Sequence, residues 1–222
     1  MGGDHGVIFD MDGVLVLSGP LHWTAWRAVA AAHGIELTRA QFLSFNGFTN
    51  PDIVARLWGR GVTTAFAADI ADCKEQAFRT ALAGSVPLAP GCRELLLALR
   101  CSGALLAVGS SAPRENVDLV LDGGGIRAQF RAVVHADMVR RGKPAPDIFL
   151  RAAELLGLPP ARCIVVEDAP SGVQAARAAG MRSIGVLTNH PADELRAAGA
   201  SAVYDDLAAI GLDAISVLLA AG

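Results

Sequence analysis

The hydrophobic positions of the chain follow two patterns, and the change between them divides the sequence. From residue 86 onward, short apolar runs alternate with segments in which apolar residues recur every three or four positions. The runs predict buried strands and the recurring positions predict amphipathic helices. The predicted strands are 105–108, 132–135, 163–166, 183–186 and 202–204. The predicted helices are 93–100, 113–121, 146–156, 171–179 and 192–198, with a last helix from residue 207.

An earlier apolar run, residues 7–9, belongs to the same sheet, because a strand that is apolar throughout needs both faces covered. Between residues 18 and 85 the sequence has no strand pattern. Its periodicity predicts helices over 21–33, 38–45, 50–58 and 64–83, with Thr38 and Asn50 as N-caps. Strands that alternate with helices form a parallel sheet with helices on both faces. We therefore predict a Rossmann-like α/β core formed by residues 1–17 and 86–222, interrupted by an all-helical cap over residues 18–85.

Composition narrows the class of protein. The 222 residues are 52% hydrophobic, which is enough for a sizeable core, and the net charge of −3 argues against nucleic acid or an acidic membrane as a partner. No apolar run approaches the ~20 residues that cross a bilayer, and no basic-then-apolar leader precedes the first strand. The four cysteines form no C-x-x-C pair and fit no zinc spacing. We expect the protein to be soluble and cytoplasmic. We favour a monomer as its oligomeric state.

Polar side chains follow the predicted strands where each strand ends. Lys143, one of only two lysines, lies in a loop just before a predicted helix. Ligands of open α/β sheets bind beyond the carboxyl ends of the strands, so these side chains are expected to converge there. They are Asp10 and Asp12 after 7–9, Ser110 and Ser111 after 105–108, and Glu167 and Asp168 after 163–166.

The grouped acids predict a metal and a phosphate. Four neighbouring carboxylates repel one another, and oxygen ligands favour a hard cation such as Mg²⁺. The Asp10 carboxylate is then placed to attack phosphorus and form an aspartyl-phosphate. Asp12 is expected to protonate the leaving group and later to take a proton from water. Ser110 and Lys143 suit the phosphoryl oxygens.

Each of these residues also has a purely structural explanation. Ser110 and Ser111 are plausible N-caps of the helix that follows them, and Lys143 fits a solvated loop. Glu167 and Asp168 fit a turn. The coincidence of acids, a hydroxyl and an amine at successive strand ends nevertheless favours a functional site.

Four segments, in this order, resemble the four motifs of the haloacid dehalogenase superfamily. They are FDMDGVL (9–15), VGSS (108–111), GKPAPDIF (142–149) and VVEDAPSG (165–172). The helical insert resembles the small helical cap of that superfamily, and the chain is most similar to the branch that holds β-phosphoglucomutases and sugar-phosphate phosphatases. The resemblance implies that Asp10 is the nucleophile and Asp12 the general acid and base. It also implies Mg²⁺ on Asp10, the Asp12 backbone carbonyl and Asp168, with Glu167 in or beside that set.

The resemblance also includes the cap, whose residues are expected to determine substrate specificity. It places His22 where the mutases carry a histidine, and residues 46–50 in a cap loop that faces the site. In the mutases this loop carries Lys and Arg, whereas this chain has Asn46 and Asn50. A neutral amide cannot replace the bidentate charge of Arg, so the grip on a second phosphate is weakened.

The second motif shows a further difference, because mutases tend to have a lysine where this chain has Pro113. Ser111 and Arg114 are candidate substrate contacts, and Arg56 and Arg79 are further cations that could compensate. Asn50 also has a strong structural explanation as a helix cap.

We therefore favour a Mg²⁺-dependent phosphatase that acts on a small phosphorylated metabolite, such as a sugar phosphate. The first alternative is a phosphomutase of the β-phosphoglucomutase type. A phosphate-binding protein without catalysis is a third hypothesis, which the presence of both Asp10 and Asp12 argues against.

Overall fold

The computed structural model describes the chain except for residues 1–4, 46–48, 60, 83 and 221–222. It divides into two compact units, one formed by Met1–Leu17 with Pro87–Gly222 and the other by Ser18–Val86. Within the described ranges, no helix is both long enough and apolar enough to cross a membrane.

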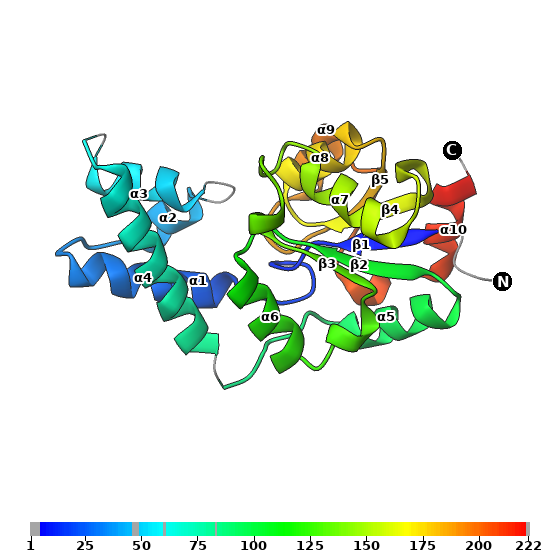
Figure 1. Ribbon diagram of the computed structural model, residues 1–222, viewed down its shortest axis with the longest axis horizontal. Coiled ribbons are helices and arrows are strands. Elements are labelled where there is room, and N and C mark those ends of the chain that lie inside the picture. Colours follow the sequence, from blue (N-terminus) through cyan, green and yellow to red (C-terminus); the bar gives the residue numbers. More distant parts are fainter. Residues whose placement is uncertain (1–4, 46–48, 60, 83, 221–222) are drawn as a thin grey trace. The chain divides into compact units, whose positions relative to one another are not determined.

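The first unit is built on a six-stranded sheet in the order β3-β2-β1-β4-β5-β6, with every pairing parallel (Figure 1). This confirms the predicted α/β class. The strands are β1 Gly6–Phe9, β2 Leu105–Gly109, β3 Ala132–Val134, β4 Cys163–Glu167, β5 Arg182–Val186 and β6 Ala202–Tyr204.

Strand β1 lies in the middle of the sheet, which explains its uninterrupted apolar sequence. Its residues pair with β2 on one side and with β4 on the other, and Val7, Ile8 and Phe9 have no exposed surface. Because Phe9 is in register with Val108 and Val166, the residues that follow these three strands emerge at one edge.

Helices cover both faces of this sheet. On one face, α7 and α8 pack Phe149 and Ala176 against Ile8 and Val165. Helix α5 contacts β2 and lies on the other side of the strands in Figure 1. The helices of this unit are α5 Cys92–Cys101, α6 Arg114–Gly123, α7 Asp147–Leu156, α8 Pro170–Ala178, α9 Ala192–Ala198 and α10 Leu212–Ala220.

The end of the chain differs from the prediction of one helix from residue 207. A short 3₁₀ helix, Leu207–Ala209, comes first, and α10 begins only at Leu212. The side chain of Asp206 accepts the Ala209 N–H at 3.1 Å, which caps a single turn.

Every secondary-structure element in the described part of the second unit is a helix, as the periodicity predicted. Its helices are α1 Gly19–Ala32, α2 Arg39–Leu43, α3 Asn50–Trp58 and α4 Thr64–Leu82. They enclose a separate apolar core that includes Trp26, Val54 and Ile70. Thr38 caps α2 with a capping box, as predicted.

Helix α3 begins differently from the prediction. Thr49, and not Asn50, is its N-cap: the Thr49 hydroxyl accepts the Asp52 N–H, and the Asp52 carboxylate accepts the Thr49 N–H. This reciprocal pair needs an acid three residues after the cap, which only Thr49 has. Asn50 is therefore the first residue of the helix, and its side chain is available for other contacts.

Candidate active site

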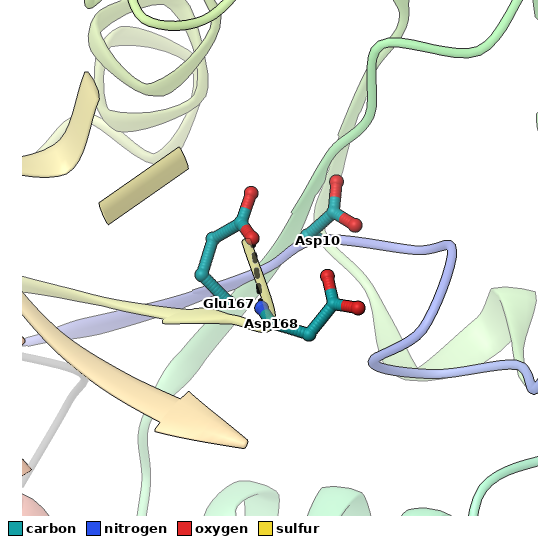
Figure 2. A group of neighbouring side chains, drawn as sticks. All are labelled: Asp10, Glu167 and Asp168. Atoms are coloured by element: carbon teal, nitrogen blue, oxygen red, sulfur yellow. Dashed lines mark hydrogen bonds between the residues drawn. The ribbon is translucent and has the colours of Figure 1, made fainter. Parts of the chain in front are cut away.

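Three carboxylates meet at the carboxyl edge of the sheet, at the ends of two neighbouring strands. Asp10 follows β1, while Glu167 ends β4 and Asp168 comes next. The Asp10 N–H donates to Val166 O at 2.9 Å, which continues the strand pairing into the site. The three residues are buried, and each offers an oxygen within 4.8 Å of the others (Figure 2). The prediction that side chains at the carboxyl ends of the strands converge is therefore confirmed for these three acids.

Lys143 joins two of these acids. Its ammonium lies 2.5 Å from Asp10 Oδ1 and 2.6 Å from Glu167 Oε1, and its side chain is only 8% exposed. The ammonium also lies 4.9 Å from the centre of the Phe149 ring, on the helix that follows its loop. The alternative of a solvated loop lysine is therefore wrong.

Both oxygens of Glu167 are occupied. While Oε1 accepts from Lys143, Oε2 accepts the backbone N–H groups of Asp168 at 2.8 Å and Ala169 at 2.9 Å, the first of which is drawn in Figure 2. A Cβ on Gly172 would overlap the Glu167 carboxylate, so a residue without a side chain is needed in this part of α8. Glu167 is thus held rigidly, and it holds Lys143 in turn.

Burial and charge shift the titration of the site. Burial raises the pKa of Asp10 to about 7, although the neighbouring Lys143 opposes the rise. Burial, together with the charges of Glu167 and Asp10, also raises the pKa of Asp168 well above its usual value. Burial alone would lower the pKa of Lys143, but the charges of Asp10 and Glu167 outweigh it and raise this pKa. Three acids against one lysine leave an excess of two negative charges when all are ionised, which suits a divalent cation.

Asp12 lies in the turn that follows β1 and is partly buried. It is not part of the three-acid group found among the described side chains. Its expected contribution to the metal is the backbone carbonyl, and that role and its role as general acid stay predictions. Gly13, which follows with φ +83°, turns the chain so that its N–H donates to Val16 O at 2.8 Å.

Ser110 follows β2, the strand beside β1, and is 1% exposed. Its hydroxyl accepts the Ala112 N–H at 3.1 Å, and its backbone N–H donates to Val134 O. Pro113 is the N-cap of α6, without any side-chain cap, so the alternative of Ser110 or Ser111 as that N-cap is wrong. Ser111 is exposed in the same loop.

The chain is similar to known proteins along most of its length. The sequence model of the haloacid dehalogenase-like hydrolases matches residues 5–180. The chain belongs to this family. The resemblance of its four motifs is thereby confirmed.

Individual relatives of this haloacid dehalogenase-like hydrolase carry different names. Fructose-1-phosphate phosphatase YqaB of Escherichia coli strain K12 is 35% identical over 183 residues, 82% of this chain and 95% of that protein. The crystal structure of a β-phosphoglucomutase from Clostridium difficile superposes with a TM-score of 0.86 and 25% identity, over 98% of this chain and 97% of the other. Protein SUPPRESSOR OF QUENCHING 1, chloroplastic, of Arabidopsis thaliana is 39% identical over 215 residues, 94% of this chain. The chain spans only 20% of that relative's length.

Arg114 and His22, two of the expected substrate-binding residues, have protein partners. Arg114 donates its N–H to Asp137 Oδ2 at 3.2 Å, and its guanidinium pairs along α6 with Asp118 at 3.3 Å. In the second unit, His22 stacks on Phe78 with ring centres 4.2 Å apart. The roles of Arg114 and His22 in binding substrate stay predictions.

Asn50 belongs to a polar cluster inside the second unit. Its amide donates to Glu75 Oε1 at 2.7 Å, and the same oxygen accepts from Lys74 at 2.8 Å. Lys74 is 3% exposed and its ammonium also lies 5.4 Å from the centre of the Phe78 ring. Asn46, the other expected cap-loop residue, lies outside the described residues.

One residue at the site was missed from the sequence. Asn189 donates its amide N–H to Asp168 Oδ2 at 2.6 Å. It lies three residues beyond the end of β5, the strand next to β4. The strand-end argument would find Asn189 only if it were extended to the fifth strand and to the third residue beyond the strand.

Proposed function

We propose that this haloacid dehalogenase-like hydrolase is a Mg²⁺-dependent phosphatase that hydrolyses a small phosphorylated metabolite through an aspartyl-phosphate. The observation that carries the proposal is the buried Lys143 ammonium, which bridges Asp10 and Glu167 beside Asp168. A lysine held against the proposed nucleophile is placed to contact the phosphoryl oxygens of a bound substrate.

The residues present fit a divalent cation. Asp10 and Asp168 would hold Mg²⁺ with their carboxylates and Asp12 with its backbone carbonyl, since Mg²⁺ takes one or two carboxylates and completes its shell with water and phosphate oxygens. Bound Mg²⁺ supplies positive charge that offsets the phosphate and the acids. Glu167 is better placed beside the metal, because both of its oxygens already accept hydrogen bonds.

The reaction then has two steps. In the first, an Asp10 oxygen bonds to phosphorus, the bond from phosphorus to the ester oxygen breaks, and Asp12 gives its proton to the leaving alcohol. In the second, water attacks phosphorus, Asp12 takes the proton, and the bond from phosphorus to Asp10 breaks to release phosphate. Ser110 and Lys143 contact the phosphoryl oxygens in both steps.

We infer that a sugar phosphate is the substrate, because a relative that this chain matches over 95% of its length is named a fructose-1-phosphate phosphatase. The structural likeness to a β-phosphoglucomutase keeps a phosphomutase as the second candidate. That candidate is weakened by Asn50, whose neutral amide is bound to Glu75. A cytoplasmic, monomeric enzyme without a nucleic-acid or membrane partner remains part of the proposal.

Phosphate release from fructose 1-phosphate and β-glucose 1-phosphate tests the proposal. We expect Mg²⁺-dependent release that EDTA abolishes and Mg²⁺ restores. Asp10→Asn should abolish turnover while its circular dichroism spectrum stays that of the folded protein, whereas Asp122→Asn, on the surface of α6, should retain turnover. A mutase would instead form glucose 6-phosphate in the presence of a bisphosphate activator. Full activity of Asp10→Asn would contradict the assignment of the nucleophile. A lack of turnover with every substrate would support the third hypothesis, a phosphate-binding protein without catalysis.

A further inference from the structure

Asn189 is joined to the proposed metal site by one hydrogen bond. Its amide nitrogen donates to Asp168 Oδ2 at 2.6 Å, whereas the Lys143 ammonium donates to the other two acids, Asp10 and Glu167. The three acids thus divide between a cationic donor and a neutral one. Because the amide binds Oδ2, it fixes the plane of the Asp168 carboxylate and leaves Oδ1 for another ligand.

The chain leaves room for this hydrogen bond at Gly13. A Cβ at this position would overlap both Asp168 Oδ2 and Asn189 Nδ2. The glycine has φ +83°, a conformation that residues with side chains rarely adopt. The turn that carries Asp12 is therefore packed directly against the pair formed by Asn189 and Asp168.

The loop that carries Asn189 is itself anchored. His190, the next residue, contacts Glu194 through Nδ1 and Oε2 at 2.8 Å, and Glu194 lies in the first turn of α9. Leu187, two residues earlier, donates its N–H to Tyr204 O at 3.1 Å, which ties the loop to β6. Asn189 is thus presented to Asp168 from a segment fixed on both sides.

We propose that Asn189 is a positioning residue for the metal, acting through Asp168. The inference rests on the proposed function, because it requires that Asp168 binds the cation. Hydrogen bonds to a carboxylate ligand hold it in the orientation that the metal needs, and loss of such a partner typically costs 10–100-fold in metal affinity or activity. The amide supplies this bond without the positive charge that would compete with the cation.

Binding of Mn²⁺, followed by the EPR signal of the free ion, tests this role without any turnover. We expect Asn189→Ala to bind Mn²⁺ about tenfold more weakly than the wild type. Asn189→Gln keeps an amide donor and should recover part of the affinity. Thr188→Ala, an exposed neighbour on the same loop, is the matched control and should bind within about twofold of the wild type. Without metal, all these proteins should stay folded at the assay temperature, as their melting curves will show.

The outcomes separate this inference from the proposed function. Asn189→Ala binding Mn²⁺ as the wild type does, while Asp168→Asn loses the ion, would overturn the role of Asn189 and leave the metal site standing. An equal loss in Asn189→Ala and Thr188→Ala would also overturn it, because the loop and not the hydrogen bond would then matter. If Asp168→Asn binds Mn²⁺ as well as the wild type, the metal site itself is wrong and the inference falls with it.

Discussion

Replacing Lys143 by methionine removes the charge that two buried acids share. Methionine keeps most of the aliphatic chain beside Phe149 but leaves Asp10 and Glu167 without the ammonium at 2.5 and 2.6 Å. Removing one partner of a buried ion pair lowers the free energy of unfolding by about 3–5 kcal/mol, because the remaining charge is buried without a partner. Since about 1 kcal/mol corresponds to roughly 2–4 °C in a domain of this size, the melting temperature should fall by roughly 6–20 °C.

Thermal unfolding followed by circular dichroism, in EDTA and near neutral pH, measures this fall. Arg141→Met is the matched control, because Arg141 lies on the same loop and pairs with Asp147 at 2.8 Å while its side chain is 70% exposed. Exposed ion pairs contribute little to stability, so this variant should melt close to the wild type. Equal melting temperatures for the two variants would refute the argument that the buried ammonium stabilises the core.

The same variant has a defined dependence on pH. Folding raises the pKa of Asp10 from 3.8 to about 7, so ionisation of this carboxyl favours the unfolded state and stability falls as the pH rises through this range. In the variant, Lys143 no longer lowers the pKa of Asp10, so folding raises this pKa further. The loss of stability in Lys143→Met should therefore shrink as the pH falls below neutral, because the unpaired Asp10 takes up a proton. A deficit that grows on acidification would contradict this account.

Two further predictions concern the metal and the packing around Glu167. Because Mg²⁺ competes with the proton on Asp10, whose pKa is about 7, its apparent affinity should be about tenfold weaker near pH 6 than near pH 8, as measured by calorimetry; an affinity independent of pH would argue against Asp10 as a ligand. Gly172→Ala places a methyl group against the Glu167 carboxylate. It should lower the free energy of unfolding by about 1–3 kcal/mol and should remove much of the phosphatase activity. Gly142→Ala, where nothing lies within 4 Å, should change neither, and equal behaviour of the two variants would refute the packing argument.

The sequence predicted most of the fold because the strands of a parallel sheet are apolar throughout. The same rule located Asp10, Ser110 and Glu167, since each stands where an apolar run ends. It missed Asn189 because two more residues separate this side chain from its strand, and a strand-end rule applied to adjacent residues does not reach it.

The errors arose where two local signals compete. At the start of α3, Thr49 and Asn50 are both good N-caps, and the choice depends on Asp52, which reaches back only to Thr49. At the end of the chain, a one-turn helix capped by Asp206 precedes α10, and periodicity does not separate a turn from a helix of this length. The pairing of Asn50 with Glu75 joins residues on different helices, so no local pattern contains it.

The hydrogen bonds of the three acids distinguish their roles. In the described part of the chain, Glu167 accepts with both oxygens, whereas Asp10 and Asp168 each accept with only one, from Lys143 and Asn189. Oxygens that already accept from backbone N–H groups or from an ammonium gain little from a cation, whereas an oxygen that accepts no hydrogen bond from the protein is open to one. We therefore propose that Asp10 and Asp168 bind the metal and that Glu167 holds Lys143 beside the phosphoryl group of the substrate.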